Sequence, residues 1–198
     1  ANAAHQNTRV VVGNVLAVYR MSATGSALDI TSTVPNTVMT GLDGVQLPGG
    51  TDGDALGAIA KAITGAYLSS EGNAFSTRTA SQIIQENFNP GEIDQPAGPL
   101  YGVQFSQLPC SDFLSRYDGL GVSVGPHRSP LGLAADPGGF PLYKGGTPIG
   151  GVGVIADNLY SLDKNVQDID RNVDEMIAYA ATYGFQAPIE RRADRLTV

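Results

Sequence analysis

The chain has little cysteine and no long apolar run, and each shortage excludes a class of protein. Its only cysteine, Cys110, cannot form a disulfide bond within the chain, so disulfides do not indicate a redox compartment. No apolar segment approaches the roughly 20 residues that cross a bilayer, and no basic amphipathic stretch would hold the chain on an anionic membrane surface. We therefore expect a soluble protein that is not inserted in a membrane.

Positive charge is scarce as well. The chain has 12 Lys and Arg against 19 Asp and Glu, which gives a net charge of -7. Such a chain repels a phosphate backbone and lacks the counterion release that drives nucleic-acid binding. We therefore expect no nucleic-acid partner.

Metal-binding patterns are weak. With two histidines and one cysteine there is no Cys/His cluster with zinc spacing. Acidic and amide residues gather between positions 157 and 170, but they lack the alternating spacing and terminal glutamate of a closed calcium loop. A solvated helix face is the favoured interpretation of that group, which comprises Asp157, Asn158, Asp163, Asn165, Asp168 and Asp170.

What the chain does have is apolar residues, glycine and proline. Its 198 residues are 42% hydrophobic and include 25 glycines and 12 prolines. This size and composition predict a single domain over residues 1–198 with long loops. We expect an α/β fold of the α+β type, in which helices pack on the faces of a mostly antiparallel sheet of about five strands.

Two hairpins are predicted. The first joins residues 9–12 to residues 15–20 through Gly13-Asn14, and the second joins residues 140–144 to residues 148–155 through Gly145-Gly146-Thr147. The Thr-, Ser-, Gly- and Pro-rich residues 22–50 predict a long loop. Further short strands are predicted near residues 37–40, 101–105 and 120–124.

Three helices are predicted from apolar spacing. The first begins at Thr51, and the second begins at the capping box of residues 79–82 and ends before Asn89-Pro90. The third, which should pack on the sheet, ends at Gly184, and the tail of residues 188–198 beyond it should be exposed. The apolar stripe of the first helix comprises Leu56, Ile59, Ile63 and Tyr67. The apolar stripe of the third helix comprises Val166, Ile169, Val173, Ile177 and Ala180. The opposite, polar face of the third helix comprises Asp168, Asp170, Arg171, Asp174 and Glu175.

Two catalytic-looking motifs lack the context that they need. Residues 121–125 match the G-x-S-x-G nucleophile elbow, but prolines follow instead of a helix and no later histidine completes a triad. Residues 151–156 match a loose dinucleotide fingerprint, but their glycines lie within a strand pattern and not in a turn. Glycines within a strand permit close approach of a neighbouring helix or of a flat ligand, and both interpretations stay open.

A haem (heme) requires only one or two axial donors and a concave apolar pocket. His127 is the best single axial candidate, although a loop residue with a local hydrogen bond is the slightly favoured interpretation. Arg128 beside it suits bidentate binding of a propionate. The other candidate ligand-binding residues are Tyr143, Gly139, Gly151 and Gly153.

Four segments together resemble the GlcG/HbpS-like haem-binding family. Residues 13–21 read GNVLAVYRM, residues 58–64 read AIAKAIT, residues 138–142 read GGFPL, and residues 148–154 read PIGGVGV. The resemblance covers about half of the chain, and the glycine-rich strand pair at residues 138–154 is its most specific part. The chain departs from the family in lacking the helix expected before the first hairpin and in having a long insertion at residues 75–117.

The resemblance implies an oligomer that binds haem or a related small molecule outside the cytoplasm, with no defined catalytic residues. The start Ala1-Asn2-Ala3-Ala4 agrees with signal-peptide cleavage, so we expect a periplasmic or extracellular protein, or a processed part of a longer one. The expected function is that of a homo-oligomeric haem-binding or small-ligand-binding domain. The alternative is a structural or assembly subunit that uses the same fold as a scaffold, and an enzyme is the third choice.

Overall fold

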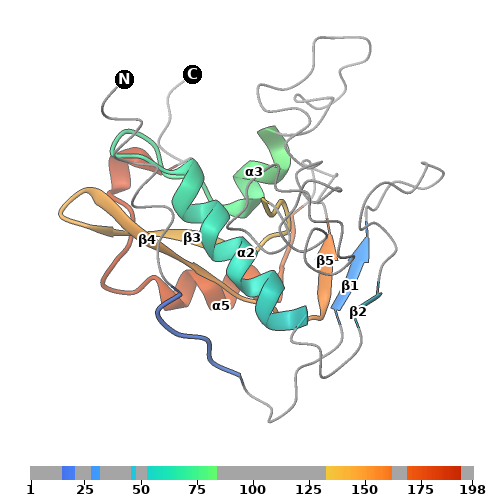
Figure 1. Cartoon of the computed structure of the whole chain (residues 1–198). Coiled ribbons are helices and arrows are strands. Elements are labelled where there is room, and N and C mark those ends of the chain that lie inside the picture. Colours follow the sequence, from blue (N-terminus) through green and yellow to red (C-terminus); the bar gives the residue numbers. More distant parts are fainter. Residues whose placement is uncertain are drawn as a thin grey trace, which may run out of the picture.

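The computed structural model describes residues 15–20, 28–31, 46–47, 53–83, 133–161 and 169–192. Strands and helices alternate irregularly along this part of the chain, so the predicted mixed α+β class is confirmed (Figure 1). Its elements, in chain order, are β1 (Leu28–Thr31), β2 (Gln46–Leu47), α2 (Gly53–Leu68), α3 (Thr77–Ile83), β3 (Gly139–Lys144), β4 (Thr147–Gly153), β5 (Leu159–Ser161), α5 (Val173–Ala181) and the short 3₁₀ helix Ile189–Arg191.

The strands of the described residues form two separate sheets, whereas the sequence predicted one. β3 and β4 form an antiparallel pair, and β1 lies between β2, to which it is antiparallel, and β5, to which it is parallel. After β4 the chain leaves the β3–β4 pair and turns at Asn158, whose φ is 62°. β5 consequently pairs with β1 and does not extend the β3–β4 pair.

The hairpin predicted from the glycine-rich segment is confirmed. Gly145 and Gly146 form its two-residue turn with φ angles of 58° and 85°. Positive φ at both turn positions matches the right-handed twist of the two strands, and glycine adopts it without steric cost.

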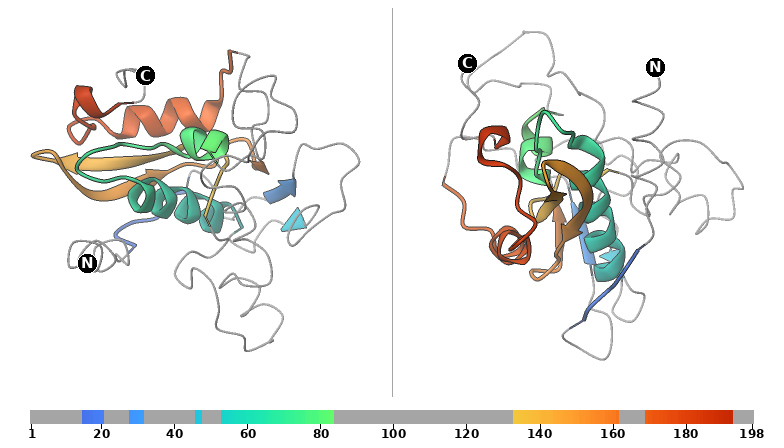
Figure 2. Two further views of the ribbon diagram at one scale, coloured as in Figure 1. Left: turned by 90° about the horizontal axis from the view of Figure 1, so that it is seen from above. Right: turned by 90° about the vertical axis from the view of Figure 1, so that its left-hand side faces the viewer.

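The hairpin lies between two helices, and this gives the described part of the molecule its layers. Figure 2 shows α2 along one face of the β3–β4 pair and α5 along the other. On the α2 side, Gly151 and Gly153 lie so close to the helix that an added Cβ atom would overlap the carbonyl oxygens of Ala62 and Ala58. On the α5 side, Gly138 lies against Asp174 in the same way.

The buried face of α2 differs from the one that the apolar stripe predicted. Tyr67 of that stripe is exposed, and Leu56, Ile59 and Ile63 are half-buried. The face against the hairpin consists of small residues and one lysine, because glycine and alanine allow the helix to approach the strand backbone closely. Its buried members are Gly53, Ala55, Gly57, Ala60, Lys61, Thr64 and Gly65.

The predicted buried face of the last helix, α5, is also wrong. Asn172 caps α5 by accepting a 2.8 Å hydrogen bond from the backbone N–H of Glu175, and Asp174 and Ala178 form its buried face. Met176 and Ile177 are exposed. Asp174 is on the buried face because it meets a buried cation that the apolar pattern did not reveal. The helix ends at Ala181, and its C-cap Thr182 lies two residues before Gly184.

Some other predictions also need correction. Residues 15–20 form no strand, and residues 15–19 are exposed. β1 and β2 lie within the predicted loop of residues 22–50. α3 begins at Thr77, where the Ser76 side chain accepts from the Thr79 N–H, which is earlier than the capping box indicated. Within the predicted exposed tail, Arg191 donates to the Gly146 carbonyl at 2.8 Å, so residues 189–192 rest against the hairpin turn.

The predicted strands at residues 9–12, 37–40, 101–105 and 120–124 lie outside the described residues, as does residue 193 onward. Among the helices that the structure does describe, none has the length and apolar character needed to cross a bilayer.

Candidate functional site

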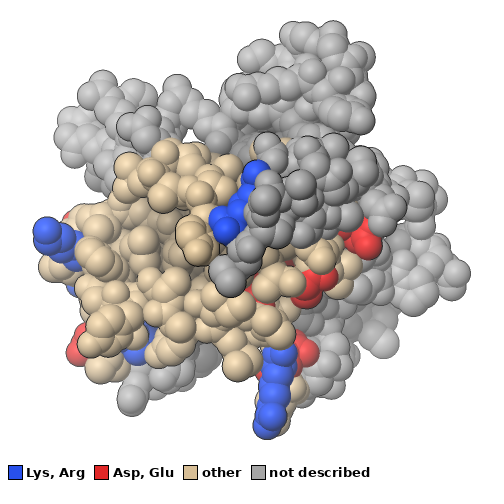
Figure 3. Space-filling view, turned by 90° about the horizontal axis from the view of Figure 1, so that it is seen from below, with Lys and Arg blue, Asp and Glu red and all other residues tan. Residues whose placement is uncertain are grey.

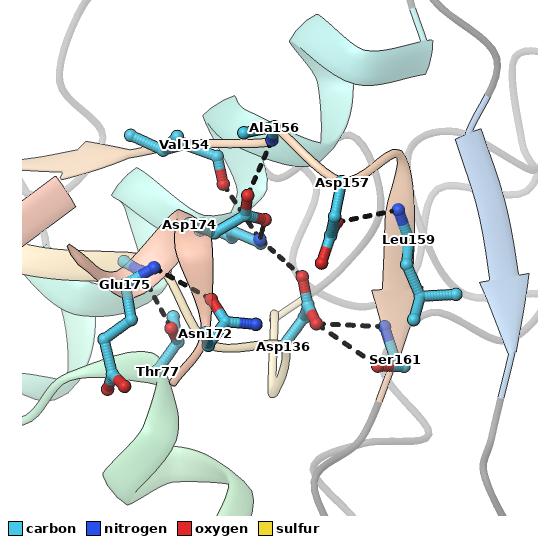
Figure 4. Close-up of polar contacts among 12 residues, drawn as sticks. Thr77, Asp136, Val154, Ala156, Asp157, Leu159, Ser161, Asn172, Asp174 and Glu175 are labelled. Atoms are coloured by element: carbon cyan, nitrogen blue, oxygen red, sulfur yellow. Dashed lines mark hydrogen bonds and ion pairs between the residues drawn. The ribbon is translucent and has the colours of Figure 1, made fainter. Parts of the chain in front are cut away.

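A lysine and two aspartates meet in the interior at the junction of both sheets and two helices. The Lys61 side chain comes from α2 and is 0% exposed. Its ammonium group contacts Asp174 Oδ2 of α5 at 2.6 Å and also contacts Asp136 Oδ2 in the segment before β3. The Val154 carbonyl accepts a third contact from it at 2.8 Å (Figure 4).

The two carboxylates are held by further donors, which fixes their positions. Asp174 Oδ1 accepts from the backbone N–H of Ala156 at 2.6 Å. Asp136 Oδ1 accepts from the backbone N–H and the hydroxyl of Ser161, at 3.2 and 3.4 Å. Asp174 also lies in the first turn of α5, where the helix dipole favours a negative charge. The cluster therefore joins α2 to α5 through an ion pair, and it reaches the end of the hairpin and β5 through hydrogen bonds.

The charges of this cluster do not balance when all three groups are ionised, because two carboxylates face one ammonium group. Burial raises the pKa of Asp136 from its ordinary value of 3.8 to about 7, and the neighbouring Lys61 opposes that change only in part. A proton on Asp136 removes the uncompensated negative charge from the interior. Asp136 is thus the carboxyl of the cluster that takes up a proton near neutral pH.

The chemical role of the cluster follows from its enclosure. A lysine with no exposed surface is reached by no dissolved substrate in this structure, so the cluster has the form of an internal brace and not of a catalytic centre. Hydrogen bonds to side chains of α2 and α3 extend the brace. Thr64 accepts from the Ala134 N–H at 2.7 Å, and Thr77 accepts from the Gly139 N–H at 2.9 Å.

A second ionic contact joins α3 to α5 at the surface. The Arg78 guanidinium donates through Nε to both carboxylate oxygens of Glu175, at 2.9 and 2.8 Å, and through Nη1 to Asp170 at 2.6 Å. All three side chains are partly exposed, so solvent weakens the attraction. Its role is to fix the position of α3 beside α5.

An open pocket of about 180 Å³ lies on the outer side of β3, beside α5. Its walls are mainly apolar, and the rings of Phe140 and Tyr179 meet there edge to face with their centroids 6.0 Å apart. The lining residues are Ala74, Ser76, Thr79, Phe140, Pro141, Tyr179, Thr182, Gln186, Ala187 and Arg192.

Arg192 is the one charged residue among those that line this pocket. Its Nε donates to the Ala187 carbonyl at 2.9 Å, which holds the side chain across the segment that follows α5. A guanidinium held in this way presents further N–H groups suited to a carboxylate. The pocket therefore combines apolar walls with a single cationic group.

Four of the predicted ligand-binding residues lie in the β3–β4 hairpin and contact protein. Tyr143 is buried, and its hydroxyl donates to the carbonyls of Ser70 and Asn73 at 2.7 and 3.1 Å. Gly151 and Gly153 face α2, and Gly139 lies between the Lys61 backbone and Thr77. The close neighbour that these glycines admit in this structure is therefore protein.

His127 and Arg128 lie outside the described residues, as do the histidine His5 and the G-x-S-x-G segment. Within residues 53–83, 133–161 and the other described ranges, no group of three or more His, Cys, Asp and Glu side chains could hold a metal ion. The structure thus brings Gly139, Tyr143, Gly151 and Gly153 into one hairpin, and none of the four is among the residues that line the pocket beside β3 and α5.

Sequence reasoning missed Lys61, Asp136, Asp174 and Arg192. Lysine and aspartate are rarely buried unless paired, so a pattern of charges normally indicates an exposed face. The signal that could have identified Lys61 is its position among small residues at helical spacing, opposite the small residues of a glycine-rich strand. Nothing in the local sequence of Arg192 marks it as lining a pocket.

Comparisons of the chain with protein-family models, with curated proteins and with solved structures find no match.

Proposed function

We propose that the chain is a small-ligand-binding domain that acts as a homo-oligomer outside the cytoplasm. The observation that carries the ligand-binding part is the pocket between β3, α5 and the segment ending at Arg192. Mainly apolar walls with a small number of polar groups, here Arg192 together with Ser76, Thr79, Thr182 and Gln186, are the usual composition of a small-molecule site. The ligand that suits this pocket is a small apolar or aromatic molecule with a carboxylate.

Membership of the GlcG/HbpS-like family is part of the proposal. Its support is that three of the four resembling segments pack together: Lys61 comes from the second, Gly139 from the third, and Gly151 from the fourth. That resemblance also implies a single sheet of about five mostly antiparallel strands, whereas the strands within the described residues form two sheets.

Haem is the ligand that the resemblance implies, and the described residues do not fit it as an enclosed group. The pocket of about 180 Å³ is smaller than the roughly 300–1,000 Å³ of pockets that enclose drug-sized ligands. The strand glycines leave no space beside α2, because an added Cβ there already overlaps the helix backbone. Haem binding through His127 and Arg128 is therefore a separate proposal with its own test.

The test of the pocket is calorimetric titration of the purified chain with benzoate and with toluene as its uncharged analogue. We expect benzoate to bind and Arg192→Ala to weaken it about 10-fold or more, since a hydrogen bond to a charged group contributes about 1.5–3 kcal/mol. Arg171→Ala, which removes an exposed arginine of the cap region of α5, is the matched control. Equal binding by both variants would refute the proposed site.

The haem proposal is tested by titrating hemin and recording the Soret band. A shift that His127→Ala abolishes supports axial binding by that residue. Absence of a shift, or a shift that His127→Ala leaves unchanged, removes His127 as the ligand.

A structural or assembly subunit is the second candidate function. The observation in its favour is the number of large apolar side chains that are exposed, among them Leu16 and Ile169, each 94% exposed. Light scattering and electron microscopy separate the two functions, because an assembly subunit would form extended polymers without any bound ligand.

A further inference from the structure

β4 is an edge strand with backbone groups that no other described strand pairs. Its one partner in the described sheets is β3, so its opposite edge is paired with no strand within the described residues. In the register of the hairpin, Gly151 lies opposite Pro141, which has no N–H to donate. The flanking pairs carry the ladder hydrogen bonds, as the bond from the Val154 N–H to the Gly138 carbonyl shows.

It follows that the N–H and C=O groups of Gly151 and Gly153 point away from β3, because hydrogen-bonding direction alternates along an antiparallel strand. No hydrogen bond joins them to any other part of the described chain. The other edge of the hairpin differs. There the Tyr143 N–H donates to the Phe185 carbonyl at 2.7 Å, so the segment after α5 covers β3.

β4 has the features of an edge strand that can pair with another strand, and few of the features that prevent such pairing. It is seven residues long and contains no charged residue. Natural edge strands are usually protected by lysines, by prolines or by a covering segment. Within the strand, Pro148 provides such protection at the turn end alone, and the stretch from Ile149 to Gly153 contains no lysine or proline.

Apolar side chains are exposed beside this edge and on the adjacent helix. Ile149 of β4 is 47% exposed, and Val173, Met176 and Ile177 of α5 are 52%, 63% and 47% exposed. Figure 3 shows a broad face without Lys, Arg, Asp or Glu, bordered by charged side chains. Because the whole chain carries a charge of -7, an uncharged face is the surface on which two copies meet with least repulsion.

We propose that the free edge of β4 pairs antiparallel with the β4 edge of a second copy of this chain. The proposal rests on the homo-oligomer part of the proposed function and names its surface. A twofold axis at Val152 places Gly151 of each copy opposite Gly153 of the other, which satisfies the outward backbone groups of both. The result is a continuous four-stranded antiparallel sheet with α2 and α5 helices on its two faces.

The twofold axis supplies the test, because Val152 of one copy then faces Val152 of the other. Like charges directly opposite each other destabilise a strand pair, and opposite charges stabilise it. We therefore compare Val152→Lys, Val152→Glu and an equimolar mixture of the two by sedimentation over a 100-fold range of concentration. Ile189→Lys replaces an exposed apolar residue on the covered side of the hairpin and is the control.

We expect the wild-type chain and Ile189→Lys to associate, each Val152 variant to dissociate at concentrations at least 10-fold higher, and the mixture to recover the wild-type mass. Recovery in the mixture also shows that the variants are folded. Association of both single variants with wild-type affinity, or no recovery in the mixture, would overturn the β4 interface alone. A wild-type chain that is monomeric throughout would also overturn the homo-oligomer proposal, whereas benzoate binding tests the pocket separately.

Discussion

The protonation of Asp136 makes the stability of the fold depend on pH near neutrality. Burial raises its pKa from 3.8 to about 7, so between these values the folded chain holds a proton that the unfolded chain releases. Stability is then greatest below about pH 4 for this group and decreases as the pH rises through 7. At 1.36 kcal/mol per pH unit, the full loss is about 4 kcal/mol, and slightly under 3 kcal/mol of it falls between about pH 5 and pH 8.

The measurement is urea unfolding, followed by circular dichroism at several pH values in that range. The Asp136→Asn variant cannot ionise, and we expect its free energy of unfolding to lose this decline with pH. Asp157→Asn replaces an exposed aspartate and should retain the wild-type decline. The reasoning is refuted if Asp136→Asn and the wild type have the same pH dependence, or if wild-type stability rises from pH 5 to pH 8.

Five further substitutions test the packing of the interior by urea unfolding. Lys61→Met leaves two buried carboxyl groups without a cation and should cost about 3–5 kcal/mol; a loss under 1 kcal/mol would contradict the ionic brace. The Tyr160 hydroxyl is buried and makes no hydrogen bond within the described chain, so Tyr160→Phe should be neutral or stabilising. Tyr143→Phe removes the hydroxyl that donates to two backbone carbonyls, and it should cost about 1–2 kcal/mol. Gly151→Ala should cost about 3 kcal/mol or more through overlap with α2, while Gly150→Ala, whose Cβ meets open space, should change stability by under about 1 kcal/mol.

The glycine-rich hairpin was predictable from sequence because its signals are local. Two glycines between apolar strand patterns specify a two-residue turn, and the turn fixes the register of the strands that it joins. The range of α2 was predictable for the same reason, since its helical spacing lies within one continuous segment.

The orientation of the helices was not predictable, because it depends on residues far apart in the chain. Asp174 is 113 positions from Lys61, and only their meeting makes it favourable to bury either one. Without that pairing, the apolar stripe containing Val173 and Ile177 is the natural choice for the buried face of α5. In the structure the face that carries Asp174 is buried instead, and Val173 and Ile177 of the apolar stripe are exposed.

The candidate site was missed for a similar reason. The pocket is assembled from β3, α5, the residues before α3 and the segment ending at Arg192, none of which carries a ligand-binding motif of its own. The residues singled out from the motif, Gly151 and Gly153, have the packing role that was one of their two interpretations. Their function as ligand contacts stays a prediction.

The most direct test of the proposed function is to record amide chemical shifts of the ¹⁵N-labelled chain during a titration with benzoate. The account predicts saturable changes concentrated at the pocket residues Ala74, Thr79, Ala187 and Arg192, with little change at exposed residues such as Lys144. Changes that are absent, or that cluster elsewhere in the chain, would contradict a ligand site beside β3 and α5.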